Sequence, residues 1–401
     1  MRTKNNHSLK IAMLGHKTVP ARDSSRGGIE VVVEELAARL VALGNEVTCY
    51  NRTGCDNGGL KEYKGIKLKS VFTIKRRGLA AMTSSFFATI RASFSSYDVI
   101  HFHAEGPCFW MWIPALLGKR CVATIHGIDH QREKWSGGPG TRFIKSGEKM
   151  AVKHASEIIV LSHGVQDYFQ ETYHRKTVFI PNGVSRPERK EAKEITEKFG
   201  LKKDSYILFL GRIVPEKGLR CLLDACKGLR TDKRLVIAGG ASDTDDFMSE
   251  LRRKASNDDR ILFTGFVNGR LREELYSNAY IYTLPSDLEG MPLSLLEAMS
   301  YGNCCVVSDI AECAEVVEDK AVVFHKGDAA ELREKLQELC DDIALMENYK
   351  KNAADFICGK YSWDEVAEKT LRLYGGEKCA PEIDSSGSVL ERRHHEDFTY
   401  Q

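Results

Sequence analysis

The sequence predicts an α/β protein built from two consecutive Rossmann-like domains. Short apolar runs that end in glycine or histidine alternate with amphipathic helical segments, and the whole pattern restarts after residue 187. A chain of 401 residues is too long for one ordinary hydrophobic core and suits two domains of roughly 150–200 residues each. We therefore place domains at residues 1–187 and 188–375 and a polar tail at 376–401. The final helix, about 361–375, is expected to pack back toward the first domain.

The first domain opens with a strand over residues 10–15 that ends in glycine. A polar loop leads to Gly27-Gly28-Ile29-Glu30, and from Val31 apolar residues recur at the three- and four-residue spacing of a helix that ends at Gly44. This strand–loop–helix unit is typical of a parallel sheet with a glycine loop at the carboxyl end of a strand. Further strands are expected at 46–50, 98–103, 120–126, 157–162 and 177–183.

The second domain repeats the arrangement. The run Tyr206–Gly211 is again a buried-type strand that ends in glycine, and it precedes a helix over about 219–227. Strands are expected at 234–239, 261–265, 279–283, 303–307 and 321–324, with helices at about 293–300, 329–342 and 345–358.

Composition excludes several classes of protein. Lys and Arg total 58 and Asp and Glu total 56, a net charge of +2, whereas nucleic-acid binders are usually strongly basic. No apolar run approaches the ~20 residues that span a bilayer, and the polar N-terminus lacks the features of a signal peptide. The 12 cysteines include no C-x-x-C pair, which favours reduced thiols and a cytoplasmic location.

The mean charge conceals an asymmetry between the halves. Residues 1–187 hold 27 basic and 15 acidic residues, a balance of +12, and residues 188–401 hold 31 and 41, a balance of −10. The basic half either attracts an anionic acceptor or the inner face of the cell membrane, or is a solvated surface without a partner. The stretch Lys75–Arg91, basic at its start and then apolar, is either an interfacial membrane helix or a buried crossover helix, and we prefer the second.

Parallel sheets bind ligands at the carboxyl ends of their strands, and two segments there carry chemistry. In Gly211-Arg-Ile-Val-Pro-Glu-Lys-Gly218, Arg212 and Lys217 stand beside a helix start, an arrangement that suits a diphosphate. The segment lacks the residue order of a P-loop, which argues against an ATPase. An ordinary basic loop is the alternative.

The second segment, Pro285 to Met299, leads from a loop carrying Glu289 into an apolar helix bearing Glu297. Carboxylates in such surroundings need hydroxyl or cationic partners, and the hydroxyls of a sugar or ribose would supply them. A helix-dipole role explains one glutamate but poorly explains both.

Together these segments resemble the donor site of glycosyltransferase family 4, retaining and metal-independent enzymes of GT-B fold. The resemblance runs from about Lys10 to about Tyr374. It also includes Gly27-Gly28-Ile29-Glu30, Thr124-Ile-His126, Ile180-Pro-Asn-Gly-Val184 and Tyr361-Ser-Trp363. Asn45–Arg52 and the glycine loop further resemble rhamnosyltransferase-like enzymes of bacterial surface-polysaccharide assembly, although the loop Pro20–Gly27 is a few residues longer.

The resemblance implies a role for each site residue. Arg212 and Lys217 would hold the diphosphate, Glu297 the ribose and Glu289 the donor sugar, so that catalysis would involve Arg212, Lys217, Glu289 and His126. Donor binding would add the loop glycines, the segment beside the nucleobase and the backbone before the helix: Gly27, Gly28, Gly265, Phe266, Val267, Gly290, Met291, Pro292 and Leu293.

The residue types fit glycosyl transfer, which builds negative charge on the departing diphosphate. Arg and Lys can stabilise that charge in place of a divalent cation, so we expect no metal and no cofactor beyond the nucleotide-sugar. Without an obvious carboxylate nucleophile, retention suggests front-face attack assisted by the leaving phosphate. The donor sugar (rhamnose, glucose, galactose, N-acetylhexosamine or mannose) stays open, and the acceptor would be a glycan or lipid-linked sugar in cell-surface polysaccharide biosynthesis.

Other features are interpreted as structural. Asp243-Thr-Asp245 resembles a metal-binding D-x-D but is expected to be a solvated turn. We expect His101 and His103 to face opposite sides of their strand, which would prevent joint metal binding. A non-catalytic nucleotide-sugar-binding module remains an alternative. An NAD-dependent oxidoreductase is less favoured because His16-Lys17 follows Gly15 where a G-x-G-x-x-G would be needed.

Overall fold

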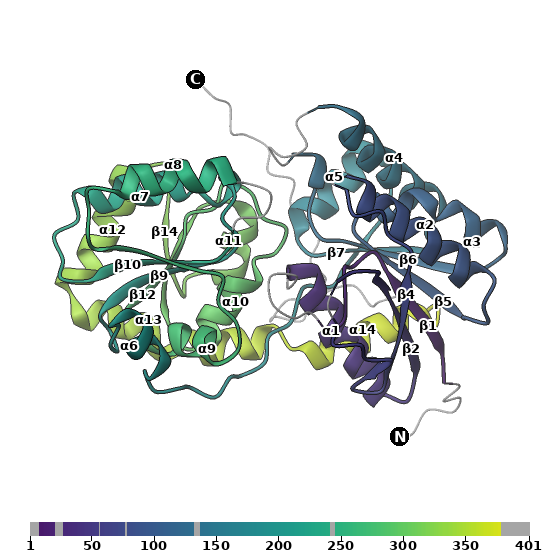
Figure 1. Cartoon of the computed structure of the whole chain (residues 1–401), viewed down its shortest axis with the longest axis horizontal. Coiled ribbons are helices and arrows are strands. Elements are labelled where there is room, and N and C mark those ends of the chain that lie inside the picture. The colour runs from purple at the N-terminus through teal and green to yellow at the C-terminus, as the bar shows by residue number, and fades with distance from the viewer. Residues whose placement is uncertain are drawn as a thin grey trace, which may run out of the picture.

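The chain folds into two α/β domains that face each other across a cleft (Figure 1). The computed structural model describes residues 8–20, 27–55, 57–76, 78–131, 137–240 and 245–377. The loop segment 21–26, Asp243-Thr244 and all but the first two residues of the expected polar tail at 376–401 lie outside the described residues.

The first domain is built on an eight-stranded sheet of order β3-β4-β2-β1-β5-β6-β7-β8, parallel except for the antiparallel pair β3 and β4. Its strands are β1 (Lys10–Leu14), β2 (Glu46–Arg52), β3 (Glu62–Tyr63), β4 (Ile66–Val71), β5 (Val99–His103), β6 (Arg120–Ile125), β7 (Glu157–Val160) and β8 (Val178–Phe179). Its helices are α1 (Gly28–Ala42), α2 (Leu79–Ser93), α3 (Trp112–Leu116), α4 (Pro139–His154) and α5 (His163–Tyr173), with short 3-10 turns η2 (Gly106–Trp110) and η3 (Asp129–Gln131).

The second domain has a six-stranded, fully parallel sheet of order β11-β10-β9-β12-β13-β14. Its strands are β9 (Tyr206–Leu210), β10 (Arg234–Ala238), β11 (Ile261–Gly265), β12 (Ile281–Leu284), β13 (Cys304–Ser308) and β14 (Val322–Phe324). Its helices are α6 (Glu194–Phe199), α7 (Leu219–Lys227), α8 (Asp245–Ala255), α9 (Gly269–Asn278), α10 (Leu293–Ser300), α11 (Ala311–Val317), α12 (Ala329–Asp341) and α13 (Ile343–Lys360), with the turn η5 (Pro215–Lys217).

The order of the strands in each sheet determines where the cleft opens. In the first sheet the order reverses between β1 and β5, and in the second between β9 and β12. Such switch points open a crevice at the carboxyl ends of the strands because the following loops diverge. Gly15 follows β1 there with φ +108°, and a Cβ on it would stand 2.2 Å from the carbonyl oxygen of His103. Only glycine lets this loop pass so close to the end of β5.

The last helix crosses back to the first domain. Helix α14 (Trp363–Tyr374) follows the second domain in sequence but packs against α1 (Figure 1). Trp363, Val366 and Leu373 share a buried cluster with Ile11 and Met13 of β1. Outside the core, Arg39 Nε donates to Asp364 Oδ1 at 2.8 Å. The chain therefore joins the two domains twice, once near residue 187 and once before α14.

Most expected elements are present. The first helix begins at Gly28, because Gly27 takes the N-cap position, rather than at Val31. The structure adds elements that were not expected from the sequence, namely strands β3 and β4 and helices α3, α4, α8, α9 and α11. None of the helices in the described part of the chain combines the length and apolar character needed to cross a bilayer.

Candidate active site

A cleft of about 440 Å³ lies between the domains, at the carboxyl ends of both sheets. The first domain contributes the loops after β1, β2 and β6 and the start of α1. The second contributes the loops after β9, β10, β11 and β12 and the start of α10. The charged side chains on its wall are Lys17, Glu30, Arg52, Asp129, Arg212, Lys217, Arg272, Glu289 and Glu297.

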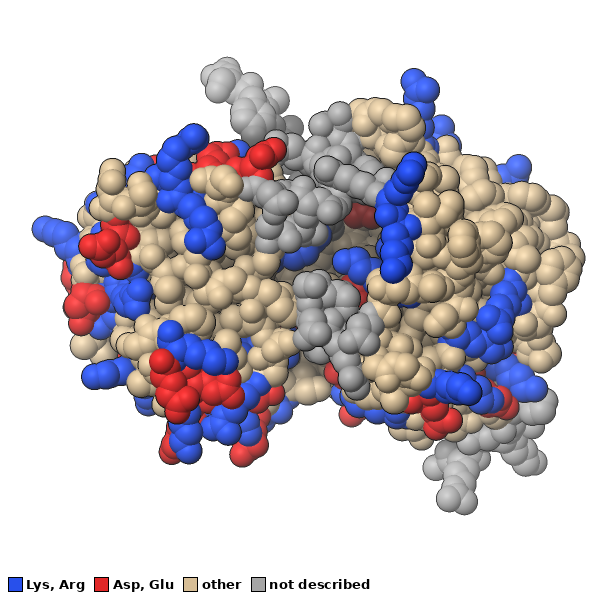
Figure 2. Space-filling view, viewed as in Figure 1, with Lys and Arg blue, Asp and Glu red and all other residues tan. Residues whose placement is uncertain are grey.

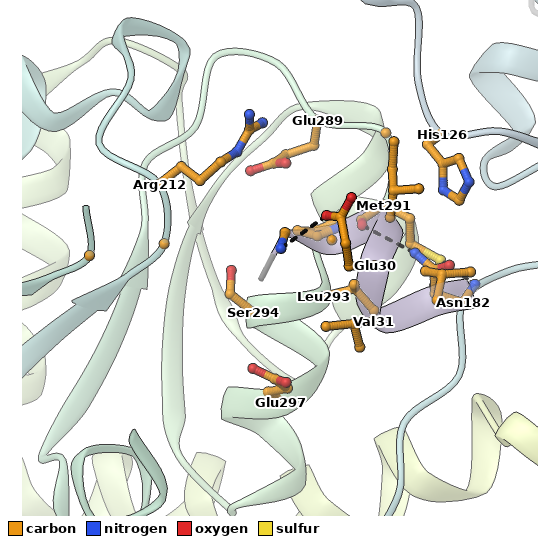
Figure 3. Close-up of a pocket in the computed structure, with 18 of the residues that line it drawn as sticks. Glu30, Val31, His126, Asn182, Arg212, Glu289, Met291, Leu293, Ser294 and Glu297 are labelled. Carbon is orange, nitrogen blue, oxygen red and sulfur yellow. Dashed lines mark hydrogen bonds between the residues drawn. The ribbon is translucent and has the colours of Figure 1, made fainter. Parts of the chain in front are cut away.

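Two helices from opposite domains begin at this cleft. Gly28 at the start of α1 lies so near the start of α10 that a Cβ on it would stand 3.6 Å from Leu293 Cδ1. The first N–H groups of a helix have no partner within the helix, and the helix dipole adds partial positive charge there. Two such ends beside one cavity favour an anionic group between them. Figure 3 shows Val31 and Leu293 from the two helices side by side.

The carboxylate of Glu30 holds the glycine loop in place at the edge of the cleft. Its Oε2 accepts from Gly27 N at 3.0 Å and its Oε1 from Lys17 N at 2.9 Å, so one buried carboxylate ties the loop after β1 to the start of α1. Arg52 stands nearby, and burial lowers the pKa of its guanidinium. Glu30 is thus committed to the protein backbone, whereas Lys17 and Arg52 add positive charge to the cleft.

Lys217 and Glu289 form an ion pair on the opposite wall. Lys217 ends η5, and its Nζ bonds Glu289 Oε1, with only about a tenth of either side chain exposed (11% and 10%). Ser286 Oγ donates to the same carboxylate oxygen at 2.7 Å. Arg212 is exposed, and Figure 3 places it on the same side of the pocket as Glu289. The loops after β9 and β12 therefore bring together residues 72 positions apart.

Glu297 projects into the cleft from α10 and bonds a residue that the sequence analysis missed. Arg272 Nη1, from α9, donates to Glu297 Oε1 at 3.1 Å, and this carboxylate raises the pKa of Arg272. The two side chains are about a quarter exposed (23% and 24%). The carboxylate thus has its cationic partner from the protein and keeps accessible surface toward the cavity.

His126 follows β6 and is backed by two buried histidines. His103 Nδ1 lies 3.2 Å from His126 Nε2, while His101 contacts Thr124 Oγ1 at 2.7 Å and Tyr374 Oη at 2.6 Å. Burial lowers the pKa of His101 to about 3 and that of His103 well below its usual value, so both rings are neutral.

The expectation that His101 and His103 face opposite sides of β5 is wrong. Their ring centroids are 4.2 Å apart, because residues two apart in a strand share a face. His103 is a buried core residue behind the cleft and does not line it.

The domains also touch directly around the cleft. Asn182 N lies 3.0 Å from Met291 Sδ, and a Cβ on Gly290 would stand 1.9 Å from the carbonyl oxygen of His126. Farther out, His163 Nδ1 bonds Glu315 Oε1 at 2.7 Å.

The structure places all but one of the residues expected at the donor site on the cleft wall. The exception is Gly265, which ends β11 and whose carbonyl oxygen accepts from Gly239 N at 2.9 Å. It supports the neighbouring glycine loop rather than lining the cavity, whereas Phe266 and Val267 do line it.

Sequence reasoning missed Lys17, Arg52, Asp129 and Arg272. The strand-end rule that identified Arg212 also applies to Lys17 and Arg52, because they stand at or just beyond the ends of β1 and β2. Arg272 belongs to a helix and carries no such signal.

Beside the loop after β6, the buried side chains of Glu105 and Glu148 form a cluster with the half-buried His130, in which one carboxylate oxygen or ring nitrogen of each residue lies within 4.8 Å of those of the other two. Glu105 Oε2 accepts from Asp129 N at 2.9 Å, and Glu148 accepts from the hydroxyls of Tyr168 and Tyr173. This cluster holds the backbone of Asp129 at the rim of the cleft.

Comparison with known proteins gives this geometry a family. Residues 26–186 match the model of Glycosyltransferase Family 4, and residues 191–356 match that of glycosyl transferases group 1. An uncharacterized glycosyltransferase of Methanocaldococcus jannaschii, MJ1607, is 26% identical over 394 residues, covering 91% of this chain and 98% of its own.

Two further comparisons extend the likeness. The O-antigen chain mannosyltransferase B of Escherichia coli is 29% identical over 189 residues, covering 46% of this chain and 49% of its own. The crystal structure of Anabaena HepE in complex with UDP and glucose superposes with a TM-score of 0.77 at 16% identity, covering 92% of this chain and 100% of that one.

The two facing sheets and their shared cleft define a glycosyltransferase of GT-B fold. Within that class the chain is a family 4-like glycosyltransferase, because its first domain matches glycosyltransferase family 4 and its second matches the glycosyl transferases of group 1. This assignment decides against the oxidoreductase alternative.

Proposed function

We propose that this protein transfers a sugar, with retention and without a metal ion, from a nucleotide-sugar to a glycan or lipid-linked acceptor in cell-surface polysaccharide biosynthesis. One observation carries the proposal: the starts of α1 and α10 and the side chains of Arg212 and Lys217 converge on a single cleft. A diphosphate is the group that this combination suits best. The likeness to HepE, solved with UDP and glucose, and to an O-antigen mannosyltransferase supports the donor and acceptor classes.

The proposed reaction uses fixed charge rather than a covalent intermediate. The acceptor hydroxyl attacks the anomeric carbon on the face from which the diphosphate leaves. The bond from that carbon to the phosphate oxygen breaks, and the hydroxyl proton passes to a phosphate oxygen. Arg212, Lys217 and the two helix starts stabilise the departing charge. Glu289 releases part of its bond to Lys217 when the diphosphate arrives, which frees carboxylate lone pairs for donor-sugar hydroxyls.

The remaining assignments follow from position. Glu297, held by Arg272, accepts from the ribose hydroxyls, and Phe266 and Val267 flank the nucleobase. His126 lies on the opposite side of the pocket from Arg212 (Figure 3), and the proposal assigns it to the acceptor side, near the transferred sugar. Rhamnose, glucose, galactose, N-acetylhexosamine and mannose are the candidate sugars. The +12 balance of residues 1–187 supports a cytoplasmic protein working at the inner face of the membrane.

A panel of nucleotide-sugars tests the proposal. The full chain is assayed with UDP-glucose, UDP-galactose, UDP-N-acetylglucosamine, GDP-mannose and dTDP-rhamnose for thermal stabilisation and for turnover in the presence of EDTA. At least one donor is expected to raise Tm, because a ligand that binds only the folded state stabilises it, and to turn over unaffected by EDTA. NMR of the product reports its anomeric configuration.

Glu297→Ala is expected to abolish transfer while leaving the fold intact, and Glu334→Ala, an exposed glutamate on α12, is the matched control. Binding without turnover would mean a non-catalytic module, and no binding by any donor would refute the proposal.

A further inference from the structure

Helix α2 turns its small, hydroxyl-bearing face inward. Its buried residues are Ser84, Ser85, Ala88, Thr89, Ala92 and Ser93. Their hydroxyls bond to carbonyls of the same helix, as Thr89 Oγ1 does to Ser85 O and Ser93 Oγ to Thr89 O, both at 2.7 Å. Its larger apolar side chains are less buried than these small ones, because Leu79, Met82, Phe86 and Ile90 are half-buried and Phe87 is exposed. A surface helix of a globular protein ordinarily points its apolar stripe at the core, so α2 has the reverse polarity.

The outward apolar side chains belong to one larger surface. Among the described residues, ten large hydrophobic side chains are exposed, and seven of them come from the segment 72–117. We call these seven the apolar face: Phe72, Ile74, Phe87, Phe94, Trp112, Leu116 and Leu117. Phe94 and Leu116 are the most exposed, at 76% and 74%. Scattered apolar residues are normal on a protein surface, but such a concentration in one segment marks an interaction site.

Ring contacts join Phe72 and Phe87 of the apolar face to each other and, through Phe86, to Trp110 of η2. The ring of Phe87 lies 5.4 Å from that of Phe72 and 5.2 Å from that of Phe86, which in turn is 4.7 Å from Trp110. Helix α2 packs on α3. At their C-terminal ends, Lys119 Nζ donates to the carbonyl of Ser95 at 3.0 Å, which joins the regions of Leu117 and Phe94. In Figure 2 the end of the molecule where Figure 1 places α2 and α3 is a broad tan area with isolated blue side chains.

The charge around the apolar face is of one sign. Residues 63–97 contain seven Lys or Arg and no Asp or Glu, and residues 106–128 also lack acidic residues. Lys75, Arg76 and Arg91 are exposed beside the apolar side chains. A second copy of the chain that docked through the same face would bring these positive charges together at an interface without counter-charges, which is unfavourable. An anionic bilayer offers both an apolar interior and negative headgroups.

We propose that the apolar face docks this protein onto an anionic lipid bilayer, with α2 lying in the plane of the headgroups. Docking needs no donor chemistry, so it stands apart from the proposed transfer reaction and can be tested separately. Phe72 and Ile74 of the apolar face follow β4 at the carboxyl edge of the first sheet, the edge at which the cleft opens, whereas Phe94, Leu116 and Leu117 precede β5 and β6 at the opposite edge. A lipid-linked acceptor would therefore reach the cleft from the end of the apolar face that holds Phe72 and Ile74.

Vesicle co-sedimentation of the full chain tests the docking. We expect binding to vesicles of equimolar phosphatidylglycerol and phosphatidylcholine, at least tenfold weaker binding to phosphatidylcholine alone, and loss of the difference at high salt, where charges are screened within a few ångströms. The double variant Phe94→Ser/Leu116→Ser should weaken binding at least tenfold. Its fold should persist because both side chains are mostly exposed. Lys75→Glu/Arg76→Glu should remove the preference for phosphatidylglycerol.

Ile343→Ser is the matched control, because Ile343 is an equally prominent apolar side chain (64% exposed) on the second domain. Its vesicle binding should equal that of the unaltered chain. Thermal stability and nucleotide binding, measured on every variant, separate loss of docking from loss of folding or of the donor site. Two results would overturn the proposal. The first is vesicle binding by the double variant that equals that of the unaltered chain. The second is an unaltered chain that binds no vesicles and is a dimer by light scattering, while the double variant is a monomer.

Discussion

Gly290 of the second domain lies against the backbone of His126 in the first, so closely that a Cβ on Gly290 would stand 1.9 Å from the His126 carbonyl oxygen. This contact joins the loop after β12 to the loop after β6. Both loops carry residues assigned to the reaction, so the distance between the domains and the geometry of the site are set at the same point.

Gly290→Ala should force the two domains apart, because a backbone oxygen cannot move aside as the end of a flexible side chain can. We expect turnover to fall at least tenfold, since small displacements of reacting groups cost that much. Each domain should stay folded because each has its own buried core.

Small-angle X-ray scattering and turnover check the Gly290→Ala prediction. Gly359→Ala is the control. Gly359 lies in α13, a Cβ there meets nothing within 4 Å, and alanine in a helix is more stable than glycine by about 0.5–1 kcal/mol. Full activity of Gly290→Ala would show that the cleft tolerates a wider spacing.

Lys217→Met and Arg212→Met should separate stability from catalysis. Both should lower kcat/KM by about 100-fold or more, because a preorganised charged donor is typically worth that much. Only Lys217→Met should lower the free energy of unfolding, by about 1–3 kcal/mol, since it leaves the nearly buried carboxylate of Glu289 without its cation. Arg212 is exposed, and its replacement should change stability by less than about 0.5 kcal/mol.

Urea unfolding and steady-state kinetics of these two variants provide the measurements. Equal destabilisation by both substitutions would contradict the difference in burial on which the prediction rests.

Glu105 should make stability decrease as pH rises. Burial, together with the carboxylates of Asp129 and Glu148, raises the pKa of Glu105 far above its usual 4.5, so the folded protein keeps a proton there that the unfolded chain releases. The resulting stabilisation is complete below pH 4.5 and declines as pH rises toward the folded-state pKa, by at most about 1.4 kcal/mol per pH unit. Glu105→Gln, neutral at every pH, should lack this decline.

The measurement is denaturant unfolding of both proteins from mildly acidic to mildly alkaline pH. The control Glu334→Gln alters an exposed carboxylate on α12 and should keep the slope of the unaltered chain. Parallel curves for the unaltered chain and Glu105→Gln would mean that Glu105 is ionised in the folded state.

His126→Ala should lower kcat more than nucleotide affinity. His126 lines the cleft from the first domain, whereas Arg212 and Lys217 line it from the second. If His126 bonds the reacting sugar as proposed, its loss should cost about ten- to hundredfold in kcat. Kd for the nucleotide alone should then stay within a factor of about 2, because the proposal assigns the nucleotide to the second domain. Calorimetry with the nucleotide and turnover give the two numbers, and His325→Ala, exposed on the second domain, serves for comparison. A large change in nucleotide affinity would place His126 at the diphosphate instead.

The sequence predicts the fold well because its signals are local. Buried parallel strands appear in a sequence as short apolar runs, and the runs that end at Gly15 and Gly211 identify β1 and β9. Strand β4 escapes this reading because Lys67, Lys69 and Ser70 interrupt its apolar residues. The start of α4 escapes it because Pro139 and Gly140 resemble a turn, although proline fits the first turn of a helix.

The sequence predicts those site residues that lie in loops directly after a strand. Arg212 and Glu289 occupy such positions and are found from the sequence. The partnership of Arg272 with Glu297 depends on how α9 packs against α10, which no local pattern reveals. The inverted polarity of α2 cannot be predicted locally either. The sequence shows that α2 has an apolar face and a hydroxyl-bearing face, but the tertiary structure determines which of the two is buried.

The return of α14 to the first domain has a consequence for biosynthesis. Trp363, Val366 and Leu373 complete a core whose other members begin at Ile11. A ribosome has therefore translated the whole second domain before the first receives its last packing element. The domain that is synthesised first is the one finished last, and until α14 leaves the exit tunnel the exposed side of α1 remains open to chaperones.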